Sequence, residues 1–287
     1  MNKIKQQLEE RYLKLGEYYN LTYDILKKIF IKNNILLIFF IILNVSGQLI
    51  TEKYRGFLKT FEILRNTNMI GIKNYWYSAM AVLIISFILL LISAIILEKT
   101  GAIIEENEKK SLGETILKFF KIFFTAFALL IVIMILIVII WIIIFIVYFI
   151  ISGTTDITLS NMKNISIINF LIYIALFVAT VIFILKTLYL VQIYFLRRVS
   201  MYEALIYSFH LCKKNKMRII LPVILFVILN ILLGIPFGIL NFATLFSKYR
   251  FLIIGISAIL SSILNIFYLI LISVIYLNVE YMDLKKS

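Results

Sequence analysis

Residues 200–226 read SMYEALIYSFHLCKKNKMRIILPVILF, and this stretch decides the fold class. It begins with Ser200 and ends its first turn with Glu203, the S-x-x-E order in which serine caps a helix and glutamate reaches back to the first backbone N–H. Four cations stand just ahead of or at the start of the apolar residues 219–240: Lys213, Lys214, Lys216 and Arg218. A cationic cluster at the mouth of an apolar run is typical of the cytoplasmic flank of a membrane span. The stretch therefore predicts an interfacial helix that leads into a span.

The composition of the whole chain agrees with this interpretation. Of 287 residues, 63% are hydrophobic and 15% are charged, and the mean hydropathy is +1.03. One soluble core of this size cannot use so much apolar surface. The net charge of +14 comes from lysines and arginines that stand beside long apolar runs. There, basic residues set orientation and attract anionic lipid headgroups, so nucleic acid is not the expected partner.

Uncharged apolar runs predict an all-α, polytopic membrane helical bundle with six transmembrane helices and interfacial amphipathic helices. The expected spans are residues 35–50, 75–97, 122–151, 165–185, 219–240 and 251–277. This divides the chain into a cytoplasmic amphipathic N-terminal segment (1–34), a six-helix membrane domain (35–280) and a short cytoplasmic tail (281–287). The third span is about 45 Å long at about 1.5 Å per residue. Because a bilayer core is about 30 Å thick, this span must tilt or extend beyond it.

The distribution of lysine and arginine predicts the orientation. If the six spans alternate in direction, 21 of these residues lie on the side of both termini and 8 lie on the other side. Positive residues favour the cytoplasmic side, so we expect a cell-membrane protein with both termini in the cytoplasm.

Two groups of candidate site residues follow from this arrangement. The first group is predicted to contact lipid headgroups or to determine topology: Lys213, Lys214, Lys216, Arg218, Arg197 and Arg198. The second group is polar and lies inside predicted spans, where interhelical hydrogen bonding is the expected role: Asn44, Gln48, Asn230, Ser261 and Asn265. A water-accessible cavity lined by the four amides of this second group would favour a permease instead.

An internal repeat is also predicted. The pair Ser111 and Glu114 repeats the capping order of Ser200 and Glu203 at an offset of 89 residues. We therefore expect two matching units, each an interfacial helix followed by a membrane hairpin. A fainter third copy precedes the first span, where Lys32-Asn33-Asn34 stands ahead of Ile35 as Lys213-Lys214-Asn215 stands ahead of Ile219.

The pattern E-A-L-x-x-S-F-x-L-x-K-x-N at residues 203–215, followed by an apolar span, carries a family resemblance. It resembles the membrane domain of bacterial glycerophosphodiester phosphodiesterases and of related free-standing, uncharacterised bacterial integral membrane proteins. The resemblance covers about residues 111–240 and does not extend to the catalytic barrel of those enzymes. It implies a non-catalytic module of the bacterial cytoplasmic membrane.

The residue types needed for catalysis are sparse. His210 is the single histidine and Cys212 the single cysteine, so neither a histidine–carboxylate metal site nor a thiolate cluster nor a disulfide is expected. No Asp or Glu lies inside the six predicted spans. We expect no enzyme and no cofactor. The favoured hypothesis is a structural or regulatory membrane module that contacts anionic lipids, a second copy or a membrane partner protein; the alternative is a permease-like component that moves a lipid or small solute.

Overall fold

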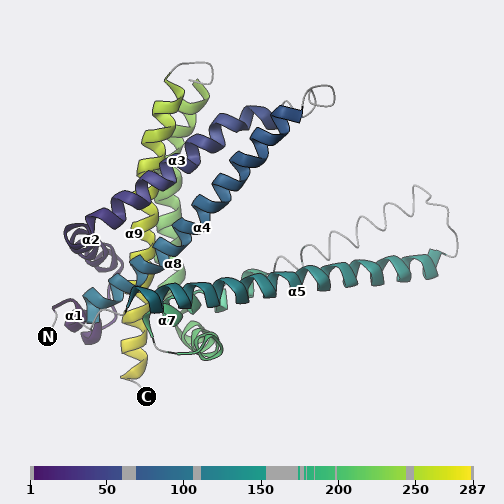
Figure 1. Cartoon of the computed structure of the whole chain (residues 1–287). Helices are drawn as coiled ribbons and strands as arrows, with labels where there is room; N and C mark the ends of the chain where they lie inside the picture. The colour runs from purple at the N-terminus through teal and green to yellow at the C-terminus, as the bar shows by residue number, and fades with distance from the viewer. Residues whose placement is uncertain are drawn as a thin grey trace.

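The computed structural model describes most of the chain as helices (Figure 1). The described residues are 3–59, 69–105, 111–152, 174, 178, 180–183, 185–197, 199–243 and 249–285. The helices are α1 (Lys3–Glu10), α2 (Leu15–Lys32), α3 (Asn34–Lys59), α4 (Met69–Glu105), α5 (Leu112–Ser152), α7 (Leu190–Leu196), α8 (Met201–Ala243) and α9 (Arg250–Leu284). The predicted all-α class is confirmed.

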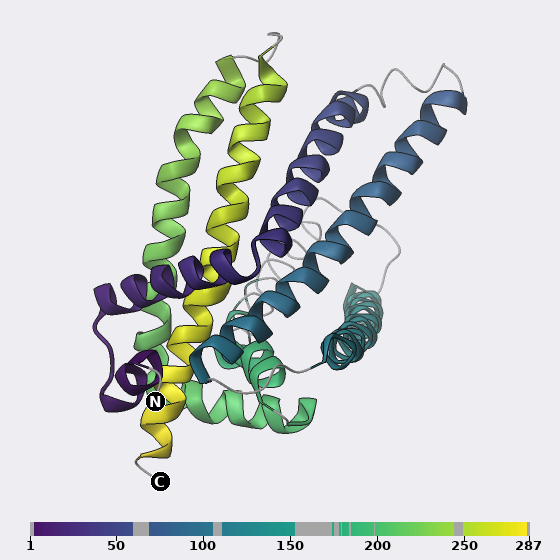
Figure 2. The ribbon, with the colours of Figure 1, turned by 60° about the vertical axis from the view of Figure 1, so that its left-hand side comes forward.

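Four of these helices contain segments long and apolar enough to cross a membrane. The segments are Asn34–Lys53, Trp76–Glu105, Asn215–Ala243 and Arg250–Leu284, and they contain or largely overlap the first, second, fifth and sixth predicted spans. They form two hairpins, α3 with α4 and α8 with α9. In both hairpins the two helices are connected at the end of the bundle that is remote from the chain termini (Figure 2). Large apolar side chains such as those of Ile35, Leu83 and Leu221 are exposed along them. This indicates a multi-pass membrane protein whose outer surface faces lipid.

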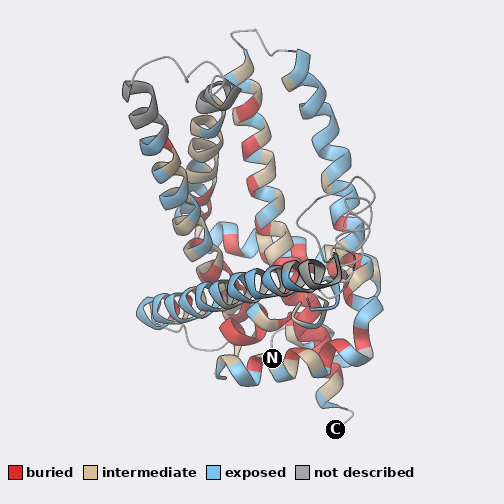
Figure 3. Ribbon diagram, turned by 90° about the vertical axis from the view of Figure 1, so that its right-hand side faces the viewer, coloured by how far each residue is buried: buried red, intermediate tan, exposed pale blue. Residues whose placement is uncertain are grey.

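The third predicted span, residues 122–151, is helical but differs from the other four in direction. It belongs to α5, which begins beside α4 at the base of the bundle and extends away from the bundle at a large angle to α3, α4, α8 and α9 (Figures 1 and 3). The ring of Phe87 on α4 anchors its first turns, with centroids 5.3 Å from Phe119 and 5.1 Å from Phe123. The fourth predicted span, residues 165–185, lies mostly outside the described residues.

A layer of short helices closes the end of the bundle where both termini lie (Figure 2). We call α1, α2, α7, residues 201–214 of α8 and the ends of α4 and α9 that pack against them the basal layer. Residues 201–214 lie across the spans, and α8 bends into its span at Asn215, whose φ of −126° and ψ of 25° are not helical. The chain therefore changes from a basal helix to a candidate membrane span at the cationic stretch, as the sequence predicted.

The same elbow occurs at the other hairpin. Between α2 and α3 stands Asn33, with φ of −139° and ψ of 41°. Each elbow asparagine follows a basal helix and precedes a hairpin of candidate spans. The structure at Asn33, in the faint third copy of the predicted repeat, is therefore more similar to the unit at Ser200 than the structure at Ser111 is. The copy at Ser111 begins alike, with the Glu114 amide donating to the Ser111 hydroxyl at 3.2 Å, but α5 then continues as one helix.

The last part of α9 is the centre of the basal layer. Residues 270–282 are buried on every side, whereas the first part of the helix buries one face only, at Ile254, Ala258, Ser262 and Ile266. The surrounding contacts come from α1, α2, α4 and α7, and buried residues gather at this end in Figure 3. Residues 281–284, which belong to the predicted short cytoplasmic tail, continue this helix, and Tyr281 and Met282 are still buried.

Candidate functional site in the basal layer

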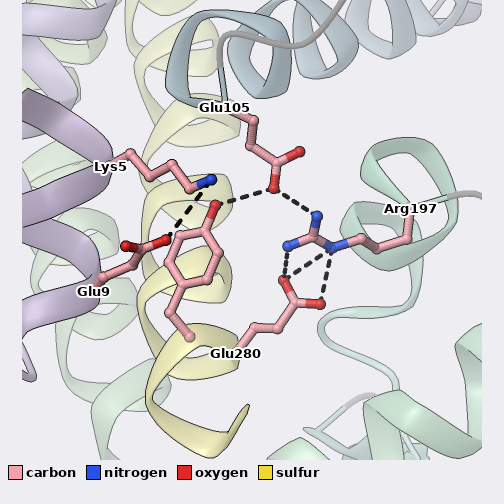
Figure 4. A network of polar contacts seen from close by, with 6 residues as sticks. Lys5, Glu9, Glu105, Arg197 and Glu280 are labelled. Atoms are coloured by element: carbon pink, nitrogen blue, oxygen red, sulfur yellow. Dashed lines mark hydrogen bonds and ion pairs between the residues drawn. The ribbon is translucent and has the colours of Figure 1, made fainter. Parts of the chain in front are cut away.

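An ion-pair network joins three segments of the basal layer (Figure 4). The guanidinium of Arg197, at the end of α7, donates from Nε to both oxygens of Glu280 at 2.9 and 3.0 Å and also pairs with it through Nη2. Its Nη1 donates to Glu105 Oε1, at the end of α4, at 2.5 Å. The hydroxyl of Tyr281 donates to the same Glu105 oxygen at 3.0 Å. The network thus locks α4, α7 and α9 together.

This geometry revises the predicted role of Arg197. Its side chain is 26% exposed, against 10% for Glu105 and 5% for Glu280. Burial opposes the charge of Arg197, but the hydrogen bonds and charge of Glu280 outweigh it and raise its pKa above the usual value. The cation is committed to carboxylates inside the protein, because a buried charge needs such partners. We therefore assign Arg197 to the packing of the basal layer, while Arg198 lies outside the described residues.

Asn278 of α9 is a second hub, which the sequence analysis did not single out. Its side chain is fully buried and makes four hydrogen bonds. Its Oδ1 accepts from the Tyr18 hydroxyl at 2.7 Å and the Leu13 amide at 3.1 Å, and its Nδ2 donates to the carbonyls of Leu8 at 2.7 Å and Arg11 at 2.9 Å. Burial raises the pKa of Tyr18 to about 12, so its hydroxyl keeps the proton that it donates.

The predicted cationic stretch lies at the α8 elbow. Lys213, Lys216 and Arg218 are exposed. The Arg218 guanidinium lies 3.7 Å from the centroid of the Tyr12 ring, and the Tyr12 hydroxyl donates to Asn215 Oδ1 at 3.4 Å. The elbow is thus braced by the loop between α1 and α2, and the lysines project from a braced turn. Lys214 is helical, but its side chain lies outside the described part of the structure.

The polar residues of the predicted spans differ in burial and in hydrogen-bond partner. Asn44 of α3 donates to the hydroxyl of Ser262 on α9 at 2.7 Å, which is an interhelical hydrogen bond of the kind predicted. The partner, Ser262, belongs to the buried face of α9, and the predicted residue Ser261 is its neighbour in sequence. Gln48, Asn230 and Ser261 are half-buried, and Asn265 is exposed.

The cap that opens α8 is the predicted capping box. The Ser200 amide donates to Glu203 Oε2 at 2.8 Å, and the Glu203 amide donates to the Ser200 hydroxyl at 3.3 Å. The hydrogen bond from the Ser200 backbone lowers the pKa of Glu203. Further along this helix, His210 Nε2 lies 3.1 Å from Asp283 Oδ2, and its ring stacks on Tyr207. Within the described residues no three His, Cys, Asp or Glu side chains gather as metal ligands.

Cys212 gives a direct test of basal-layer packing. Its side chain is 1% exposed, and burial raises the pKa of the thiol. Because the thiolate is the reactive form, we expect a maleimide to label Cys212 slowly at pH 7 in the folded protein and faster as the pH rises. Mass spectrometry before and after denaturation in SDS measures this. The Cys212→Ser, Lys213→Cys variant moves the thiol to the exposed neighbouring position and should react at once; rapid labelling of Cys212 itself would contradict the packing.

In comparisons with known proteins, no family model, no curated protein and no solved structure matches this chain.

Proposed function

We propose that this chain is a non-catalytic integral protein of the bacterial cytoplasmic membrane, a structural or regulatory module that acts through lipid or partner contacts at its basal layer. The observation that carries the proposal is the position of Lys213 and Lys216. Both are exposed and flank the elbow at Asn215, where α8 enters its span. A lysine at that level lies among lipid headgroups and contributes about 1 kcal/mol towards an anionic surface.

The basal layer supports a structural role more than a catalytic one. Its buried charges, Arg197 with Glu105 and Glu280, are paired with one another. Asn278 uses all of its hydrogen-bonding capacity on the chain itself. Such saturated groups brace helices. The likeness to the membrane domain of glycerophosphodiester phosphodiesterases remains a prediction that is consistent with this role.

We also propose that α5 crosses the membrane, with the predicted fourth span after it, so that six spans place both termini in the cytoplasm; this requires α5 to turn, at its first residues, from the direction that it has in Figure 1 to the direction of the four other spans. The support is the sequence of α5, which has no charged residue from 122 to 151 and is apolar on every face. A helix of this kind is buried in hydrocarbon or in protein.

This topology predicts a labelling pattern for single cysteines in a Cys212→Ser background. Tyr249→Cys, at the exposed turn between α8 and α9, should react with an impermeant maleimide added outside intact cells. Lys213→Cys should react only after permeabilisation. Ser152→Cys, at the end of α5, should react from outside if α5 crosses. Labelling of Lys213→Cys in intact cells would contradict the orientation, and protection of Ser152→Cys from the outside would contradict the crossing of α5.

The lipid contact is tested in nanodiscs of phosphatidylcholine with and without phosphatidylglycerol. We expect the anionic lipid to raise the thermal midpoint of the wild-type protein and to raise that of the Lys213→Gln, Lys216→Gln variant less. Lys3→Gln, which removes an exposed lysine of α1 away from the elbow, is the control and should behave as wild type. Equal responses from all three proteins would contradict the lipid contact.

The non-catalytic part of the proposal has its own assay. The same nanodiscs are offered glycerophosphodiesters and phospholipids, and products are followed by mass spectrometry. We expect no turnover. Turnover that is lost in the His210→Ala variant would overturn the non-catalytic interpretation.

A further inference from the structure

An open pocket of about 740 Å³ lies between the first turns of α5 and the connection from α7 to α8. It is separate from the cationic stretch at the α8 elbow. Its lining residues are Leu117, Lys118, Phe120, Lys121, Phe124, Thr125, Tyr194, Val199, Ser200 and Met201. A pocket of this size holds a phospholipid headgroup with the first part of its acyl chains rather than a whole lipid.

Lys118 connects the two walls of the pocket, which are α5 and the segment from α7 to α8, and so fixes their separation. Its ammonium donates to the carbonyl oxygens of Tyr194 at 3.1 Å and Arg197 at 3.0 Å, and it lies over the ring of Tyr194. Because Arg197 is fixed in turn by Glu105 and Glu280, the end of α7 is rigid. The pocket is thus formed before any ligand arrives, which lowers the ordering cost of binding.

One side of the pocket is apolar and continues along α5. Leu117, Phe120 and Phe124 are exposed although they are large and hydrophobic, and Phe127 and Ile131 continue the exposed surface. The charge-free run of the helix follows directly. An acyl chain laid along this face would cover side chains that the described protein leaves uncovered.

The polar side of the pocket has one exposed cation, Lys121, near the hydroxyls of Thr125 and Ser200. The Thr125 hydroxyl donates to the Lys121 carbonyl at 2.7 Å and keeps its lone pairs as acceptors. Lys121 is also the last charged residue of α5, because the charge-free run 122–151 begins directly after it. A lysine at such a boundary extends its aliphatic stem along apolar surface and places its ammonium at headgroup level.

From this combination we propose that the pocket binds one anionic phospholipid, with the phosphate on Lys121 and the start of an acyl chain against Phe120 and Phe124. The proposal deepens the lipid contact of the proposed function and rests on it. The pocket differs from the lipid contact at the elbow because it is a single site that one lipid saturates. The attraction of Lys213 and Lys216 for an anionic surface has no fixed stoichiometry.

Native mass spectrometry of the full chain, released from detergent micelles and titrated with phosphatidylglycerol or phosphatidylcholine, tests the site. We expect the first phosphatidylglycerol to bind more tightly than the first phosphatidylcholine. Lys121→Gln should lower the association constant of that first phosphatidylglycerol about fivefold, the loss of one lysine contact, and leave phosphatidylcholine unchanged. Lys3→Gln, which removes an exposed lysine of α1 that lies outside both the pocket and the elbow, should change it less than twofold.

Three results would overturn the site. The first is an equal loss in the Lys3→Gln and Lys121→Gln variants, which means diffuse attraction without a pocket. The second is displacement of the lipid by millimolar inorganic phosphate, which means a site for free anions. The third is unchanged binding in a Val199→Trp variant that fills the pocket and retains the wild-type thermal midpoint. Because Lys213 and Lys216 stay intact in the Lys121→Gln variant, a failure here leaves the nanodisc result for the proposed function standing.

Discussion

Replacing Arg197 by glutamine is expected to lower the free energy of unfolding by about 3–5 kcal/mol, the usual cost of removing one partner from a buried ion pair. The variant leaves Glu105 and Glu280 in the basal layer without their cation, and their side chains are only 10% and 5% exposed. It also releases α7 from α4 and α9. Unfolding by SDS in mixed micelles, followed by circular dichroism, measures the loss.

A charge-free repair separates the electrostatic cause from a loss of shape. In the triple variant Arg197→Met, Glu105→Gln, Glu280→Met no charge remains in the network, and the new amide oxygen on α4 would still accept the hydrogen bond of Tyr281. Since well-packed neutral groups replace buried ion pairs at little cost, the triple variant should recover most of the stability. Arg218→Gln, which removes a cation from the Tyr12 ring, is the control and should cost no more than about 1 kcal/mol. A triple variant as unstable as Arg197→Gln would contradict the electrostatic explanation.

Asn278→Leu is expected to cost about 3 kcal/mol, because it leaves several buried polar groups without a partner. Those groups are the Leu8 and Arg11 carbonyls, the Leu13 amide and the Tyr18 hydroxyl. The loop between α1 and α2 should loosen first, and limited proteolysis near Arg11 reports on that directly.

The matched control for this variant is Asn265→Leu on the same helix. Asn265 is exposed on the part of α9 that buries one face only, so the change should leave stability within about 0.5 kcal/mol of wild type. Equal losses in the two variants would mean that the change of residue type, rather than the hub at Asn278, determines stability.

Local features of the chain were predictable from sequence because their causes lie within a few residues. The capping box needs only Ser200 and Glu203, and both of its hydrogen bonds are present. The four described spans follow from uncharged runs of sufficient length. The change from the basal helix to the candidate span was indicated by the cations between them, because such a cluster is typical of the flank of a membrane span.

Contacts between distant segments were not predictable in the same way. Arg197 looked like a headgroup residue because Glu105 and Glu280 lie 92 and 83 positions away in the chain. Asn278 stood near the end of an apolar run and gave no signal, since its partners are more than 250 positions away. Ser262, rather than Ser261, pairs with Asn44 because the rotation of a lipid-facing helix depends on its neighbours.

In the predicted repeat, the weaker sequence match, at Asn33, predicts the structure better than the stronger match, at Ser111. The match between Ser111 and Ser200 rests on caps, which say how a helix begins and nothing about where it bends. The match between Asn33 and Asn215 rests on the residue at the bend, and the two backbones are alike there. A signal located at the turning point of the chain is therefore more informative about the architecture than one at a helix start.

The hub at Asn278 has a consequence for the order in which the protein is made. Its partners between Leu8 and Tyr18 leave the ribosome before it, and Asn278 follows them by 260 to 270 residues. At about 5–20 residues per second, α1 and α2 wait on the order of tens of seconds before α9 can dock. During that interval the early hairpin can enter the bilayer while its basal helices remain unassembled. Closure of the basal layer is therefore a late step relative to the synthesis of α1 and α2, and it occurs only in chains that have been translated beyond Asn278 of α9.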